Sequence, residues 1–175
     1  MELELRMYGL VPYNISEIQR GIQFGHGVVE YAQKYFTDSD YQEWADKWKT
    51  FIILNGGISN HVDSLCTGSM ETHVIALLEN GIKIATFNEP DLNDMLSSII
   101  FLVDERVFDR ERYPDFDLIS IYDRNIFVDP MNPEFPSISN LSGIEVRELW
   151  EKWVELIGGK QNLFLRNFLK DFRLA

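Results

Sequence analysis

The chain has 175 residues, which is enough for one well-buried core but not for two ordinary domains and a linker. Apolar residues make up 45% of it and aromatic residues 13%, a composition that excludes intrinsic disorder. The formal net charge of −12 excludes a generally basic nucleic-acid-binding surface, because phosphate contacts need clustered Lys and Arg side chains.

A strand and a helix are predicted at the start of the chain. Residues 4–11 alternate polar and apolar side chains and stop at Pro12, which indicates a strand closed by a turn. Asn14 or Ser16 then caps a helix that runs to about residue 35, and Ser16 has the capping-box spacing to Gln19. The apolar stripe expected on this core helix consists of Ile18, Ile22, Val29, Tyr31 and Phe36.

A short helix and a buried strand follow. Asp38 or Ser39 begins the helix, in which Trp44 and Trp48 share one face because they are four residues apart. Residues 50–54 are β-branched, aromatic or aliphatic throughout. We therefore expect them to form a buried central strand.

The next segments complete a sheet. Ser69 begins a helix that ends at Gly81, and residues 82–87 then form a strand. Beyond an acidic turn at residues 88–91 and a brief helical segment, residues 98–103 form a further buried strand. This order predicts an α/β fold, a small mixed β-sheet covered by helices.

The predicted α/β core spans residues 1–104, and residues 105–175 form an extension. Residues 106–136 are rich in Asp, Pro and aromatic residues, so we expect an irregular wrap with one strand at residues 118–121.

Two helices are predicted in the rest of this extension. A capping box formed by Ser142 and Glu145 begins the first, and the second covers residues 161–173. We expect both to pack on the core. Their aromatic faces are core contacts or surfaces for a second copy, as in a homodimer, or for a protein partner: Trp150, Trp153, Phe164, Phe168 and Phe172.

The sequence predicts a cytoplasmic protein without a membrane span. Its first ten residues are too charged for a secretory leader, and no apolar run approaches the ~18 to 20 residues of a spanning helix. The single cysteine, Cys66, excludes an internal disulfide and is compatible with a reducing compartment.

Metal, cofactor and nucleophile motifs are not apparent. The side chains with ligand chemistry are His61, Asp63, Cys66 and His73, and their spacing matches no compact zinc pattern. Neither a Gly-x-Ser-x-Gly elbow nor a phosphate-binding Gly-x-x-x-x-Gly-Lys run occurs, which sets aside serine hydrolases and nucleotidases. We expect no metal and no cofactor.

The first helix carries three glycines, Gly21, Gly25 and Gly27, around Gln23 and His26. Each glycine costs a helix about 1 kcal/mol relative to alanine. Ordinary packing does not favour three of them, so we expect another group to approach this helix closely.

Four pieces of sequence, in order, resemble the type 2 peptidyl-tRNA hydrolases, the archaeal and eukaryotic class, and more closely a phage-encoded branch related to it. They are residues 23–27 on the first helix, the strand at residues 49–53, residues 77–82 leading into the next strand, and the acidic turn after Phe87. The resemblance covers residues 3–103. It implies a small α/β sheet fold and hydrolysis of the ester that joins a stalled peptide to the 3′ ribose of tRNA.

The resemblance also implies roles for individual side chains. His26 would be a general base or would orient water, since imidazole titrates near neutral pH. Glu89 stands where the family has an aspartate and would hold the histidine or the water, while Gln23 and Lys49 would hold the substrate end. The other substrate-binding residues expected are Arg20, Asp91 and Ser97.

Departures from the family pattern support a second hypothesis. Glu17 and Gln19 occupy positions where the family has lysines, and the net charge opposes tRNA binding unless Lys49, Lys83 and the basic tail converge. The alternative is a catalytically inactive binding module of the same fold, acting on a protein partner or a small nucleotide ligand.

Purely structural roles compete with catalysis at the same residues. A neutral His26 can be buried in a core with one hydrogen bond. Glu89, Asp91 and Asp94 lie around a predicted helical turn, where acidic side chains act as caps. Capping and catalysis do not exclude each other.

Overall fold

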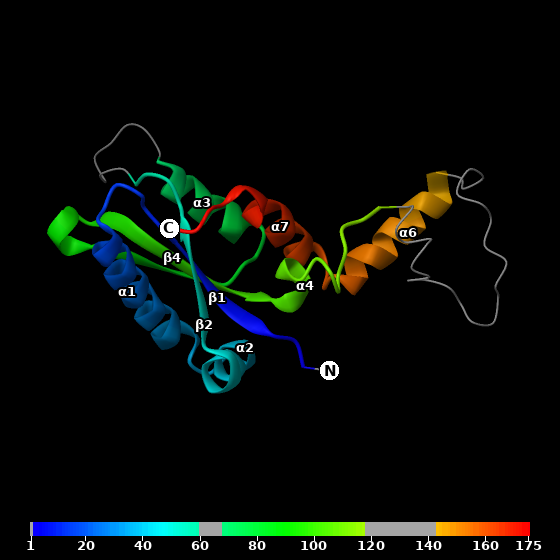
Figure 1. Cartoon of the computed structure of the whole chain (residues 1–175), viewed down its shortest axis with the longest axis horizontal. Coiled ribbons are helices and arrows are strands. Elements are labelled where there is room, and N and C mark those ends of the chain that lie inside the picture. The colour runs from blue at the N-terminus through cyan, green and yellow to red at the C-terminus, as the bar shows by residue number, and fades with distance from the viewer. Residues whose placement is uncertain (1, 60–67, 118–142) are drawn as a thin grey trace.

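The computed structural model describes residues 2–59, 68–117 and 143–175, and its centre is a four-stranded sheet in the order β2-β1-β4-β3 (Figure 1). Strand β1 (Leu5–Val11) runs parallel to β2 (Thr50–Asn55) and antiparallel to β4 (Met95–Asp104). Strand β3 (Ile84–Glu89) pairs antiparallel with β4. The predicted mixed α/β sheet is confirmed.

Helices cover both faces of this sheet, and the side chains of β4 alternate between the two cores. Ile99, Phe101 and Val103 belong to a core cluster with α3 and α7, whereas Ile100 belongs to a cluster with α1. Strand β4 is therefore the centre of the molecule, buried along nearly its whole length.

Helix α1 (Glu17–Tyr35) begins as predicted. Ser16 is its N-cap, and both hydrogen bonds of the capping box with Gln19 are present. The side chains that face the sheet are Gln23, Phe24, Gly27 and Tyr31.

The apolar stripe predicted for the core side of α1 is wrong for most of its members. Ile18 is 78% exposed, and Ile22, Val29 and Phe36 are exposed as well, leaving only Tyr31 buried. The exposed members lie within one side of the helix, opposite to Phe24 and Gly27. The helical period was right, but the polar and glycine side packs inwards instead.

The short second helix also follows its predicted cap. Asp38 accepts from the N–H groups of Asp40 and Tyr41 to begin α2 (Ser39–Glu43), which continues as a π-helical turn (Trp44–Trp48). Trp44 is buried and Trp48 half-buried, and both pack into the core cluster on the α1 face.

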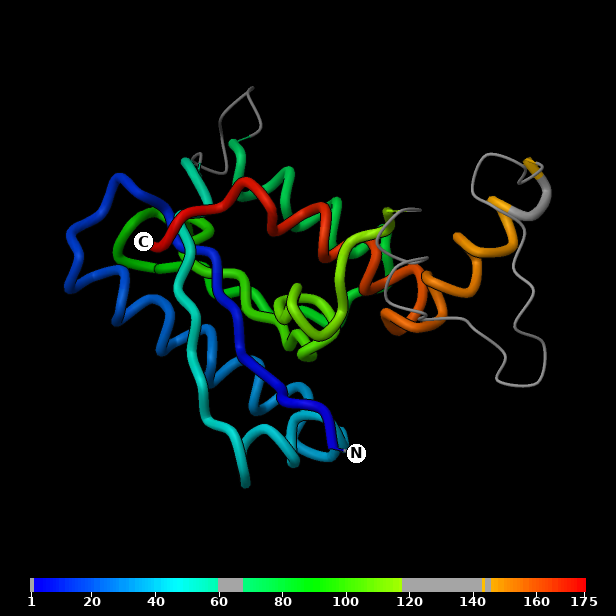
Figure 2. Tube along the Cα trace, turned by 45° about the vertical axis from the view of Figure 1, so that its right-hand side comes forward, coloured from blue at the N-terminus to red at the C-terminus, as the bar shows by residue number. Residues whose placement is uncertain are grey.

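On the other face lie α3 (Ser69–Glu79) and α7 (Lys160–Phe168), side by side in both views (Figures 1 and 2). Gly81 has φ +70° just after α3, as a helix terminator requires. The rings of Phe164, Phe168 and Phe172 stack in sequence against this core, with centroid separations of 5.3 and 5.0 Å.

The last predicted helix is too long by several residues. Helix α7 ends at Phe168, a 3₁₀ turn (Leu169–Asp171) follows, and the tail then extends along β2. Asn55 N–H donates to the Arg173 carbonyl at 2.9 Å, and Ala175 N–H donates to the Ile53 carbonyl at 3.0 Å.

This tail explains a second correction, which concerns β2. The apolar run at residues 50–54 predicted a central strand, but β2 is the edge strand of the sheet. Its outer edge is covered by the tail through the Leu54–Leu174 bridge. An edge strand covered in this way carries the apolar composition of an interior one.

Beyond β4 the chain forms two further helices. A short helix α4 (Glu105–Phe108), which the sequence did not predict, follows the strand at once, and α6 (Gly143–Leu156) projects away from the sheet (Figure 1). The predicted strand at residues 118–121 and the predicted cap Ser142 lie outside the described residues. Within the described residues, no helix is both long and apolar enough to cross a bilayer.

Candidate functional site

Four of the sequence-predicted residues meet at the end of the sheet where β3 stops. Gln23 and His26 lie one turn apart on α1, Glu89 ends β3, and Ser97 lies near the start of β4. Gln23 Nε2 donates to Glu89 Oε2 at 2.5 Å, and His26 Nδ1 lies 3.8 Å from the same oxygen. We call these four residues the His–Glu–Gln–Ser cluster.

Ser97 reaches this cluster because the sheet is irregular there. Phe87 pairs with Ser98 and Asn88 pairs with Leu96, so Ser97 is the extra residue of a β-bulge. A bulge re-aims the side chain that it leaves unpaired. The Ser97 hydroxyl consequently lies 2.8 Å from Gln23 Oε1 and 3.1 Å from the Phe87 carbonyl oxygen.

Burial decreases steadily along the cluster. Ser97 is fully buried and Gln23 is 5% exposed, whereas the Glu89 side chain is 14% and the His26 side chain 47% exposed. The His26 ring also rests at 4.6 Å, edge on, against the ring of Phe87. The solvent-accessible imidazole of His26 therefore lies at the outer end of the cluster, and the hydrogen-bonded side chains of Gln23 and Ser97 form its buried end.

The orientation of the Gln23 amide is fixed by its two partners. Its nitrogen faces a carboxylate, which only accepts, and its oxygen faces a hydroxyl, which can donate. Gln23 therefore holds Glu89 beside His26, and Ser97 holds Gln23.

The three glycines of α1 divide into two groups. A Cβ at Gly27 would lie 2.3 Å from Ser98 Oγ and 2.7 Å from Ile100, so this glycine permits close packing of the helix on β4. At Gly21 and Gly25 a Cβ would meet nothing within 4 Å. These two glycines leave open backbone on the exposed side of α1, the side of Ile18 and Ile22.

Glu89 also has the structural role considered above. Its Oε1 accepts from Asp91 N–H at 3.4 Å and begins a 3₁₀ turn (Pro90–Leu92), so one carboxylate caps this turn and faces His26. Asp91 and Asp94 are exposed at the rim, and Asp94 has φ +55°.

The remaining predicted residues are placed less favourably. Arg20 lies one turn before Gln23, but its guanidinium donates to the Tyr13 carbonyl at 2.8 Å. Lys49 precedes β2 at the level where Thr50 pairs with Arg6, roughly 25 Å along the sheet from Glu89. The structure thus places Lys49 and Gln23 toward opposite ends of the sheet.

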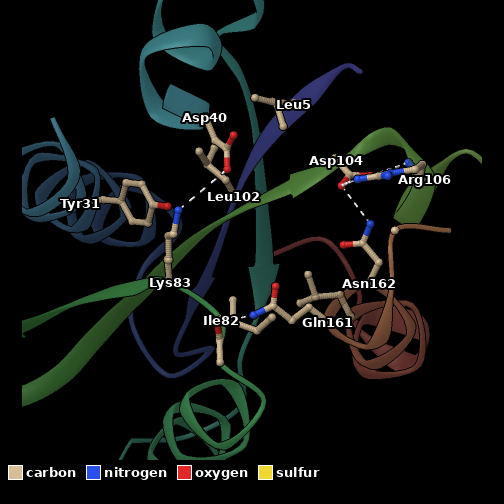
Figure 3. Close-up of a pocket in the computed structure, with 13 residues that line it drawn as sticks. Leu5, Tyr31, Asp40, Ile82, Lys83, Leu102, Asp104, Arg106, Gln161 and Asn162 are labelled. Atoms are coloured by element: carbon tan, nitrogen blue, oxygen red, sulfur yellow. Dashed lines mark hydrogen bonds and ion pairs between the residues drawn. The ribbon is translucent and has the colours of Figure 1, made fainter. Parts of the chain in front are cut away.

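Sequence reasoning did not find two hollows outside this cluster. One, of about 540 Å³, is lined by His73, Phe168, Phe172 and the tail, and burial lowers the pKa of the His73 imidazole. The other, of about 260 Å³, lies at the far end of the sheet around Tyr31, Lys83 and Asn162 (Figure 3). Neither is lined by His26 or Glu89.

The described residues contain no group of three side chains arranged to hold a metal ion. Of the four ligand-type residues considered above, His61, Asp63 and Cys66 lie outside the described residues. No family model, curated protein or solved structure matches the chain.

Proposed function

We propose that this chain hydrolyses the ester between a peptide and the 3′ ribose of tRNA, with His26 taking a proton from the attacking water. The observation that carries the proposal is the His–Glu–Gln–Ser cluster, in which Glu89 Oε2 lies between Gln23 and His26. The resemblance of residues 3–103 to the type 2 peptidyl-tRNA hydrolases supplies the substrate class.

The geometry is suited to general base catalysis by one imidazole nitrogen. Nδ1 of His26 faces the Glu89 carboxylate, which leaves Nε2 for a water molecule. When the imidazole accepts the water's proton, it becomes a cation next to an anion, and the Coulomb attraction stabilises that state. The hydroxide attacks the ester carbonyl carbon, the bond from that carbon to the 3′ ribose oxygen breaks, and the imidazolium returns its proton to the leaving oxygen.

Gln23 and Ser97 act as positioning residues in this proposal. Gln23 donates a short hydrogen bond to Glu89, and Ser97 in turn donates to the Gln23 amide oxygen. Glu89 cannot move away from His26 without losing its bond to Gln23. The His26 side chain is 47% exposed, so a bulky substrate end can reach it.

The test is the rate at which the full chain releases the acyl-amino acid from an N-acetylated aminoacyl-tRNA. His26→Ala is expected to lower this rate by about a hundredfold or more, because it removes the general base. Glu30→Gln, on the exposed surface of the same helix, is the matched control and should retain the wild-type rate. An unchanged rate in His26→Ala would reject the mechanism.

The second candidate is a binding module of the same fold that has no hydrolytic activity. It is favoured by the net charge of −12 and by the remoteness of Lys49, which leave few cations for phosphates near the cluster. This hypothesis predicts that the chain does not release the acyl-amino acid from the aminoacyl-tRNA and does not bind tRNA at moderate salt. A steeply salt-dependent tRNA complex would contradict it.

A further inference from the structure

The smaller hollow, of about 260 Å³, lies where the C-terminal extension meets the core, at the end of the sheet remote from His26. Strand β4 continues through Asp104, whereas its last pair with β3 is Phe101 with Ile84. The space beside residues 102–104 is therefore not filled by a strand. It is enclosed by α1, by the loop before β3 and by α7 (Figure 3).

One side of this hollow presents hydrogen-bond donors. Tyr31 is 1% exposed, and its hydroxyl has no hydrogen-bond partner among the described residues. Burial, followed by nearby acidic groups, raises the pKa of this phenol, so it remains a donor. Lys83 Nζ donates to Asp38 at 2.5 Å, lies 4.0 Å from Asp40, and is next to the Tyr31 hydroxyl (Figure 3).

The opposite side presents acceptors. Both N–H groups of the Asn162 amide are used, by Asp104 at 2.9 Å and by the Ile157 carbonyl at 2.7 Å. Gln161 Nε2 donates to the Gly81 carbonyl at 2.8 Å. Because these partners fix both amide orientations, Asn162 Oδ1 and Gln161 Oε1 are the atoms left to face the space.

The Asn162 side chain is 7% exposed, and its Oδ1 accepts no hydrogen bond from a described residue. A ligand that donates to Asn162 and accepts from Tyr31 would satisfy both groups at once.

The charges around the hollow disfavour a simple anion or a simple cation. Lys83 and Arg106 are already paired with Asp38 and Asp104, and Asp40 lies 4.0 Å from Lys83. A bare anion would meet Asp40, and a bare cation would meet Lys83. The apolar walls are Leu5, Ile82, Leu102 and Leu165.

We propose that this hollow binds an amino acid in its zwitterionic form, with the carboxylate accepting from Tyr31 and Lys83 and the ammonium donating to Gln161 and Asn162. Its aliphatic part lies against the leucine and isoleucine walls. The C-terminal extension supplies the acceptor side, so the complete site needs α7 as well as the α/β core.

The experiment is isothermal titration of the full chain with a panel of amino acids, both α-amino acids and ω-amino acids such as 4-aminobutyrate. At least one is expected to bind saturably. Butyrate and butylamine, each carrying one charged half, should bind at least about tenfold more weakly, because each loses one set of partners. Absence of binding by every amino acid, or equal binding of either half, would overturn the proposal.

Two variants localise the binding to this site. Tyr31→Phe removes a hydroxyl that bonds nothing in the described protein, and Gln161→Ala removes one acceptor; each should weaken binding roughly fivefold. Tyr35→Phe and Asn167→Ala lie on the same two helices but line neither side, so they should bind as the wild type does. Equal affinity in Tyr31→Phe and wild type would contradict the assignment.

This proposal does not depend on hydrolysis. His26→Ala should bind the amino acid with unchanged affinity, since His26 lies at the opposite end of the sheet. A loss of binding in that variant would contradict the separation of the two sites.

Discussion

Two neighbouring serines on β4 show how much a single residue's environment decides. Ser97 and Ser98 are both fully buried. The Ser97 hydroxyl holds Gln23 and the Phe87 carbonyl, whereas the Ser98 hydroxyl has no partner among the described residues. Ser98 lies directly under Gly27, where the absence of a Cβ makes room for it.

This contrast predicts opposite effects of the same substitution. Ser97→Ala should lower the free energy of unfolding by about 1 to 3 kcal/mol, because it strands the Gln23 oxygen in a buried site. Ser98→Ala removes an unsatisfied hydroxyl and should leave stability unchanged or raise it. Urea unfolding gives the free energy of unfolding of both variants. Equal losses of this free energy would show that the hydrogen bond between Ser97 and Gln23 does not contribute to stability.

Ser97→Ala also separates positioning from catalysis. If Ser97 acts by holding Gln23 and hence Glu89, the variant should lower kcat by roughly tenfold and leave KM nearly unchanged. A higher KM with an unchanged kcat would assign Ser97 to substrate binding instead.

The sequence identified most of the residues of the candidate site, but it gave less information about which of them contact each other. Gln23, His26 and Glu89 were selected from the family resemblance, and the structure brings all three together. The Ser97–Gln23 bond depends on a bulge, and no local signal in the sequence marks where two strands lose register. The hollow around Tyr31 was equally invisible, because the residues that line it come from six separate segments of the chain.

Among the elements, α1 is the clearest case in which periodicity located the helix but not its buried side. The Ser16 cap and the helix end are local and were predicted correctly. Which side packs is a tertiary property: Gly27 and Phe24 fit the surface of β4 and β1, whereas the isoleucines do not.

The exposure of α1 leads to a prediction with a matched pair. Ile18→Lys should change the free energy of unfolding by less than about 0.5 kcal/mol, because the side chain is 78% exposed. Phe24→Ala should cost about 3 to 5 kcal/mol, since Phe24 is 5% exposed in the core cluster. Thermal unfolding of the two variants compares them, and a comparable loss in Ile18→Lys would mean that this side of α1 is covered.

The segment that follows α7 covers the outer edge of strand β2. The aromatic spacing of Phe164, Phe168 and Phe172 suggested a continuous helix, but the rings also stack across a 3₁₀ turn. The tail beyond them then pairs with β2. Sequence patterns describe one element at a time, so a strand whose edge is covered from 120 residues away resembles a central one.

In the molecule as a whole, one ion pair ties the α2 cap to the start of β3. Burial raises the pKa of the Asp38 carboxyl, while Lys83 and the N–H groups of Tyr41 and Asp40 lower it, and the net shift is downward. The corresponding contribution to stability is present above the unfolded pKa near 3.8 and is lost as the pH falls through the folded value.

Lys83→Met should therefore destabilise the protein by less than about 1 kcal/mol near pH 7, because Lys83 is half exposed. The difference from wild type should shrink as the pH falls below 3.8. Lys170→Met, which loses no ion pair among the described residues, is the control. Urea unfolding at pH 7 and pH 3 checks this, and a difference that grows in acid would have the wrong sign.

The two proposed sites lie at opposite ends of the sheet. The His–Glu–Gln–Ser cluster lies at the end of the sheet where β3 stops, and the amino-acid site lies at the end where β3 begins. Strand β4 connects the two, with Ser97 near one end and Asp104 at the other. The core alone builds the first site, and the second also needs the C-terminal extension.

The central claim is that His26 and Glu89 act as one catalytic unit. The measurement that tests it most directly is the single-turnover rate of N-acetyl-aminoacyl-tRNA hydrolysis in His26→Ala, Glu89→Gln and the double variant. We predict losses of about a hundredfold or more in each single variant, with a double variant no slower than the slower single one, because residues that act as a unit are not additive. A wild-type rate in either single variant, or losses that multiply in the double variant, would contradict the account.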